Sequence, residues 1–86
     1  MKYVYIVTCV APDSAAFTKH RATQNAHLAI ELACEYAYGA NWRSQSNLRK
    51  RDQFARALRG GRDVFVDNGP YARSLRQALC ERLTVE

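Results

Sequence analysis

The sequence predicts a small two-layer α+β domain in which helices pack on a three-stranded antiparallel sheet. Three observations predict this class. Residues 2–10 are β-branched and aromatic almost throughout, two central stretches repeat their apolar residues with helical spacing, and residues 62–67 alternate between apolar and polar. The predicted order of elements is β-β-α-α-β-α, within a single domain that spans residues 1–86. A chain of this length buries only a modest core.

Residues 2–10 (KYVYIVTCV) form the first predicted strand, and both of its faces are largely apolar. This pattern is typical of a central strand covered on both sides, or of a strand whose second face meets a partner. After a turn at residues 11–14, residues 16–23 predict a weaker second strand that returns as a hairpin. Because a three-stranded sheet is near the lower limit for independent stability, the doubly apolar strand favours a homodimer or a bound state.

The next predicted element is a helix over residues 26–38, with Asn25 as its N-cap and Gly39 just after its end. Its wide apolar arc is expected to face the sheet, and its small residues allow a close approach. The expected buried arc contains Leu28, Leu32, Tyr36, Ala26, Ala29, Ile30, Ala33 and Ala37. The opposite strip contains His27, Glu31, Cys34 and Tyr38.

A linker over residues 40–45 contains the only tryptophan, Trp42. We interpret Trp42 first as a core residue between the two helices, and alternatively as an exposed contact residue. The second predicted helix runs from Leu48 to Arg59, with Ser46 or Asn47 as its N-cap and two glycines at its end.

Residues 62–67 (RDVFVD) form the third predicted strand, with two valines on one face and two aspartates and a phenylalanine on the other. The following Asn-Gly-Pro predicts a turn, in which the proline suits the first position of a helix. The last predicted element is therefore a helix over residues 71–83, whose leucines and alanines recur with helical spacing.

The excess positive charge of the chain lies in residues 46–62. The net charge of the whole protein is +5, and this segment alone holds six cations and one anion, Asp52. Charge this localised indicates an acidic partner, either nucleic acid or an acidic protein surface. A solvated helix face is the alternative interpretation. The cations are Arg49, Lys50, Arg51, Arg56, Arg59 and Arg62.

The predicted start of this helix adds a second argument for function. A helix that begins at Leu48 places Arg49, Lys50 and Arg51 in its first turn, where the helix dipole disfavours cations. A sequence selected only for folding is expected to have acidic residues there.

No residue pattern predicts an enzyme, a metal site or a cofactor. The three cysteines, Cys9, Cys34 and Cys80, lack paired spacing and are expected to be buried or half-buried thiols. His27, Glu31 and Cys34 share one helix strip, but His27 and Cys34 lie two turns apart, too far for a direct hydrogen bond. No apolar run approaches the ~18 residues of a membrane span, and no secretion signal is recognised, so we expect a cytoplasmic protein.

In its size and its lack of motifs, the chain resembles the small inhibitors that phages encode against host machinery, anti-CRISPR proteins among them. This resemblance implies a non-catalytic protein that docks the basic helix, residues 46–62, on an acidic surface of a nucleic-acid-handling complex. The six cations would supply the electrostatic attraction, with Trp42 or Phe54 as an anchor. The alternative is a small regulator that binds nucleic acid directly, using the same helix on phosphates.

Overall fold

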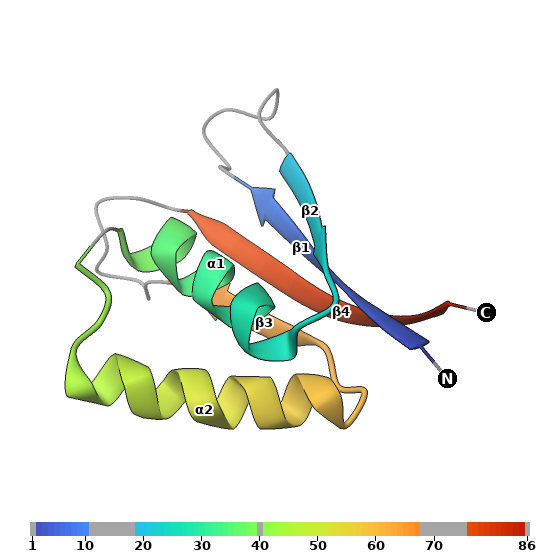
Figure 1. The fold of residues 1–86 in the computed structure, drawn as a ribbon. Helices are drawn as coiled ribbons and strands as arrows, with labels where there is room; N and C mark the ends of the chain where they lie inside the picture. The colour runs from blue at the N-terminus through green and yellow to red at the C-terminus, as the bar shows by residue number, and fades with distance from the viewer. Residues whose placement is uncertain (1, 11–18, 40, 68–75, 86) are drawn as a thin grey trace.

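Two helices pack on one face of a four-stranded sheet in the computed structural model, which describes residues 2–10, 19–39, 41–67 and 76–85 (Figure 1). The elements follow one another as β1 (Lys2–Val10), β2 (Lys19–Thr23), α1 (Ala26–Tyr38), α2 (Gln45–Arg59), β3 (Val64–Asp67) and β4 (Gln77–Val85). The α+β class and the antiparallel sheet are confirmed. Neither helix is long and apolar enough to cross a membrane, within the part of the chain described.

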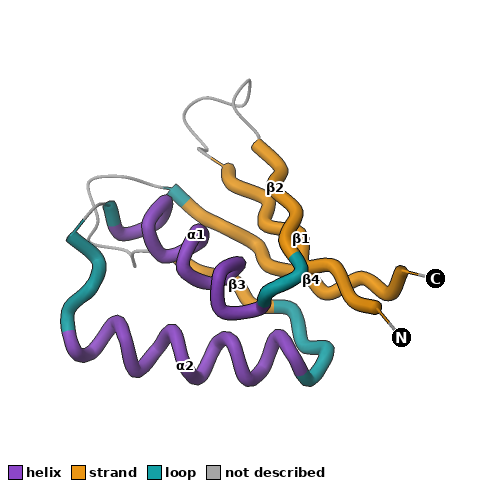
Figure 2. The backbone as a smooth tube through the Cα atoms, viewed as in Figure 1, coloured by secondary structure: helices purple, strands orange, loops and turns teal. Residues whose placement is uncertain are grey.

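The strands lie in the order β2-β1-β4-β3, and every neighbouring pair is antiparallel. β1 is an internal strand, as its two apolar faces predict, and it pairs along its whole length with β4. The two helices carry the chain from the β2 edge of the sheet to the β3 edge (Figure 2). α1 contacts all four strands, and α2 packs beside α1 and reaches β3 and β4.

The core lies between the helices and one face of the sheet. Alternate residues of the strands point into it, including Val7, Val66 and Cys80, while α2 contributes Ala55 and Leu58. α1 contributes mainly small side chains, which let its backbone lie close to the strands. Its buried residues are Ala26, Ala29, Ile30, Ala33, Cys34 and Ala37.

The prediction of a third helix over residues 71–83 is wrong, and so is the prediction of three strands. Residues 77–85 form β4, which lies between β1 and β3 and pairs with both. Its residues (QALCERLTV) are mostly helix formers, but hydrogen bonding to two neighbouring strands outweighs that local preference. Residues 71–75, and the predicted turns at 11–14 and 68–70, lie outside the described residues.

The predicted bounds of α1 are confirmed, including its N-cap, because the Asn25 side chain accepts a hydrogen bond from the Leu28 backbone N–H. The predicted buried arc is rotated, however. Leu28 is 44% exposed, whereas Cys34, expected on the opposite strip, is fully buried. The buried side of α1 is centred on its alanines, and Leu28 lies on the side of the helix away from them. The alternation predicted for residues 62–67 is confirmed, with both valines buried and Phe65 exposed.

Candidate binding face of helix α2

Helix α2 begins at Gln45, three residues before the predicted start. Its N-cap is Ser44, whose side chain accepts a hydrogen bond from the Asn47 backbone N–H at 3.4 Å. Arg49, Lys50 and Arg51 therefore lie beyond the first turn, and the dipole argument for their function does not hold. Arg56 and Arg59 lie in the last turn, where the dipole favours cations.

One side of α2 faces α1 and carries paired charges. The Arg51 guanidinium lies 3.0 Å from the Glu31 carboxylate of α1 and 3.2 Å from Asp52, and only 23% of its side chain is exposed. Arg59 hydrogen-bonds the His27 ring, whose Nε2 lies 3.8 Å from Asp52. The strip of α1 that the sequence places opposite the predicted buried arc is thus the strip that packs against α2. The residues of this helix–helix seam are His27, Glu31, Arg51, Asp52 and Arg59.

The other side of α2 carries exposed cations. Arg49, Lys50 and Arg56 are exposed on the helix, and Arg62 follows just after its end. None of the four forms an ion pair within the described ranges. Arg56 and Arg62 line one shallow hollow of about 340 Å³ together with Gln53. We call Arg49, Lys50, Arg56 and Arg62 the outer stripe.

The structure divides the seven residues that the sequence assigns to a partner. Four form the outer stripe, whereas Arg51 and Arg59 take part in the seam. Trp42 is 2% exposed and belongs to the core, which confirms its first interpretation, and it also lines the cleft described below. The guanidinium of Arg43 lies over its ring at 5.1 Å. The tryptophan is buried because it fills the gap beside the two helices, as a large apolar side chain does in a small domain.

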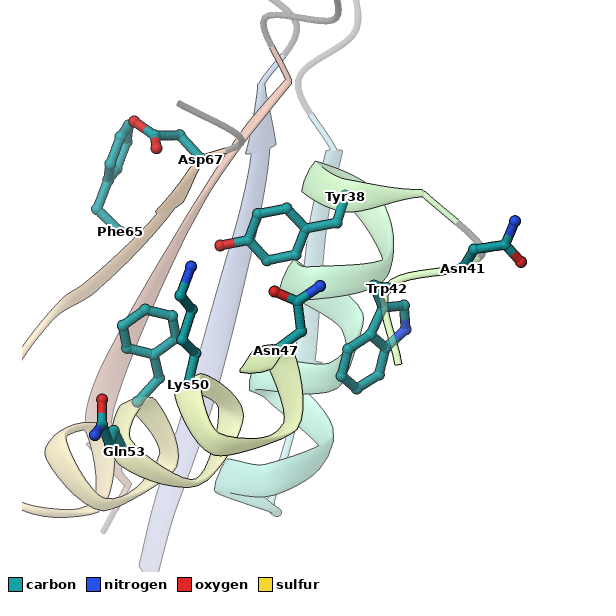
Figure 3. Close-up of a pocket in the computed structure, with 9 residues that line it drawn as sticks. Tyr38, Asn41, Trp42, Asn47, Lys50, Gln53, Phe65 and Asp67 are labelled. Carbon is teal, nitrogen blue, oxygen red and sulfur yellow. The ribbon is translucent and has the colours of Figure 1, made fainter. Parts of the chain in front are cut away.

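A cleft of about 630 Å³ opens beside the outer stripe, between the end of α1, the first half of α2 and strand β3 (Figure 3). Lys50 extends toward the hydroxyl end of Tyr38, and Asn47 lies next to them. Phe54, Phe65, Gln53 and Asp67 complete most of the lining. Burial raises the pKa of the Tyr38 hydroxyl, and the negative charges of an ionised Cys34 and of Asp67 act in the same direction, so Tyr38 is a neutral donor near pH 7.

The end of α2 is held by Arg82 of β4. Its Nη1 donates a hydrogen bond to the Arg59 carbonyl oxygen at 2.6 Å, and its guanidinium lies 4.2 Å from the Tyr3 ring centroid. This contact places a cation at the carbonyl end of the helix, where it is stabilising. Gly61 passes so close that an added Cβ would lie 2.7 Å from Arg82 Nη2.

All three cysteines are buried, as predicted. Burial raises the pKa of Cys34 to about 11, an increase that Arg51 opposes and Glu31 reinforces. Burial also raises the pKa of Cys80 to about 12. At neutral pH both groups are protonated thiols rather than thiolate nucleophiles. Among the described residues, no three His, Cys, Asp or Glu side chains are grouped as metal ligands would be.

The sequence alone did not reveal the cleft. Its lining residues come from α1, α2 and β3, so only the fold brings them together. The signal available was the high aromatic and amide content of residues 38–54, which has no characteristic spacing. The chain matches no protein-family model, no curated protein and no solved structure.

Proposed function

We propose that the protein is a non-catalytic binding protein that docks the outer stripe of α2 on an acidic surface of another protein. The observation that carries this proposal is the set of four exposed cations that form no ion pair with any described residue. Arg51, on the same helix, lies close to the carboxylates of Glu31 and Asp52. An arginine that packs between the two helices therefore does have acidic partners. Unpaired cations gathered on one face attract and orient an anionic partner.

The acids around the outer stripe favour a protein partner over nucleic acid. Asp52 lies on the α1 side of the stripe, Asp63 follows Arg62 in the chain, and Asp67 lines the cleft together with Lys50. A nucleic acid backbone carries a continuous row of negative charge and would pass close to these carboxylates. A protein surface places its acids one at a time, so it can meet the cations and avoid the acids. An inhibitor of a nucleic-acid-handling complex, such as an anti-CRISPR protein, is the narrower form of this proposal.

The cleft favours a second candidate function, direct binding of nucleic acid. Aromatic rings next to a cation are the groups on which single-stranded bases stack while a phosphate is neutralised. Tyr38, Phe54 and Phe65 supply the rings, and Lys50 supplies the cation. Asn47 and Gln53 supply amide groups that can hydrogen-bond to base edges.

Binding to defined anionic probes at several salt concentrations tests both functions. The probes are single-stranded and duplex DNA and RNA of about 20 nucleotides and a polyglutamate peptide of similar charge. The test variant is Arg49→Gln/Lys50→Gln/Arg56→Gln. The control variant, Arg21→Gln/Arg43→Gln/Arg76→Gln, removes the same charge from exposed residues outside α2. Circular dichroism establishes that both variants are folded.

We expect the wild type to bind polyglutamate at least as tightly as the oligonucleotides, and the α2 variant alone to lose that binding. Tighter binding to an oligonucleotide would establish the second function instead, with a salt slope that falls by about 0.7–0.9 for each phosphate contact removed. If no probe binds, or if both variants lose binding equally, both functions are contradicted, because the attraction would then be absent or due to net charge alone.

A further inference from the structure

Strand β3 forms one edge of the sheet and lies beside helix α2. In the order β2-β1-β4-β3 it has a single neighbouring strand, β4, within the described part of the chain. β2 forms the other edge, but α1 alone of the two helices contacts it, whereas both helices contact β3. An edge strand presents backbone N–H and C=O groups on which a further strand can form. The surroundings of β3 therefore indicate which kind of chain fits there.

A groove follows α2 beside this edge. β3 comes after α2 in the chain and runs back beside it (Figure 1). The cleft is lined by both elements, and the shallow hollow continues it toward the end of α2, because Gln53 lines both. We call the cleft and the hollow together the groove. Its lining includes Lys50, Gln53, Arg56 and Arg62 from α2 and its end, and Phe65 and Asp67 from β3.

The α2 side of the groove is positively charged. Lys50, Arg56 and Arg62 belong to the outer stripe, and Asp67 is the only acid among the described residues that line the groove. The helix rises about 9 Å between Lys50 and Arg56. Alternate residues of an extended chain lie about 6.7 Å apart on one face. Two successive acids on that face are therefore within reach of both long cationic side chains.

The other face of β3 offers an apolar contact. Phe65 alternates with two buried valines and is 53% exposed. On the β4 side it is paired with Leu79. Directly opposite residues on neighbouring strands contact one another, so a strand added at the free edge would place a second side chain against Phe65. An apolar residue suits that position.

We propose that the partner contributes an extended segment, alternating acidic and apolar residues, that adds to the edge of β3 as a fifth strand. Its acidic side chains face the cations of α2, and its apolar side chains lie on the other face, beside Phe65. Main-chain hydrogen bonds supply affinity in this mode of recognition, and the alternate side chains supply specificity. The inference rests on the function proposed above and names the part of the acidic partner that meets the outer stripe.

Two peptides of identical composition test the proposal. One alternates glutamate with valine over nine residues, and the other has the same glutamates grouped at one end. We expect the alternating peptide to bind at least about 10-fold more tightly. At saturation it should slow hydrogen exchange of β3 backbone amides at least about 10-fold in NMR spectra, because they become hydrogen-bonded. The amides of β2, the other edge strand, are the internal control and should not change.

A substitution on β3 separates the edge from the charge. Phe65→Thr removes the apolar contact and keeps a residue type that suits a strand. It should weaken binding of the alternating peptide about 5-fold, the effect of one good cross-strand pair, and leave polyglutamate binding unchanged. Leu83→Thr is the matched control, because Leu83 is 50% exposed but lies on β4 outside its pairing with β3. It should affect neither peptide.

The outcomes distinguish this inference from the function on which it rests. Polyglutamate binding that depends on the outer stripe, with no preference for the alternating peptide and no protection of β3, would overturn the inference and leave the proposed function intact. Protection of β3 that persists at the same affinity in Arg49→Gln/Lys50→Gln/Arg56→Gln would contradict the proposed function and the acidic character of the segment. If no acidic peptide binds, both are overturned.

Discussion

Three consecutive cations of α2 have different environments. Arg51 faces α1 and lies close to two carboxylates, whereas Arg49 and Lys50, its neighbours in sequence, are exposed and form no ion pair in the described part of the chain. The helix turns about 100° per residue, which places adjacent side chains on different sides. Residue type and local charge therefore do not separate a structural arginine from one available to a partner. The side of the helix does.

This comparison implies that stability and binding can be altered separately. Changes in the seam or in the core should destabilise the fold. Changes in the outer stripe should leave stability almost unaffected while they weaken binding. The largest expected effects come from the buried thiols of Cys34 and Cys80, and the smallest from the outer stripe.

The largest effect is expected from the two buried thiols at alkaline pH. In the unfolded chain a cysteine ionises near pH 9.0, but in the folded protein the pKa of Cys34 is raised to about 11 and that of Cys80 to about 12. The unfolded state therefore loses protons first, and stability falls as pH rises above 9. Each thiol can contribute a loss of up to about 1.4 kcal/mol per pH unit in this window.

Urea unfolding in reducing buffer between pH 7 and 10.5 measures this loss. The Cys34→Ala variant should show a shallower decline above pH 9, since one titrating thiol is absent. The exchange also removes a buried sulfur, so the slope with pH, and not the stability at pH 7, is the quantity to compare. A wild-type stability that is constant to pH 10.5 would contradict the burial of the thiols.

Much of the fold could be predicted from the sequence, because most of its elements have local signals. The alternation of residues 62–67 and the cap and stop of α1 are properties of short segments. β4 was missed because its signal is not local. Its residues prefer a helix, and they form a strand only because β1 and β3, distant in sequence, need a partner between them.

The candidate site could be predicted only in part, for the same reason. Charge counting identified α2, but it could not distinguish Arg51, whose partner Glu31 lies twenty residues away on another helix. The cleft combines Tyr38, Lys50 and Phe65 from three elements, and no spacing in the sequence indicates their proximity.

An intermediate effect is expected at the end of α2. Gly61 has φ of +89°, which side chains rarely adopt, and an added Cβ would displace the Arg82 guanidinium that caps the helix. We expect Gly61→Ala to lower the free energy of unfolding by about 1–3 kcal/mol. Gly60→Ala is the control, because φ of −75° suits alanine and its Cβ would meet only ordinary contacts, so a change within about 0.5 kcal/mol is expected. Similar losses in both variants would show that Arg82 does not hold this turn.

The smallest effects are expected from substitutions of Arg51 and Arg49 in α2. Arg51→Met keeps the length of the side chain but removes the charge that faces the partly buried Glu31, and we expect a loss of about 1 kcal/mol in urea unfolding. Arg49→Met makes the same chemical change on the exposed side and should change stability by less than about 0.5 kcal/mol.

A further readout separates lost charge from lost packing. Glu31→Gln in the Arg51→Met background should cost little more, because the two residues form one interaction. If Arg49→Met costs as much as Arg51→Met, or if the losses of the Arg51 and Glu31 variants simply add, the two sides of α2 do not differ as the structure indicates.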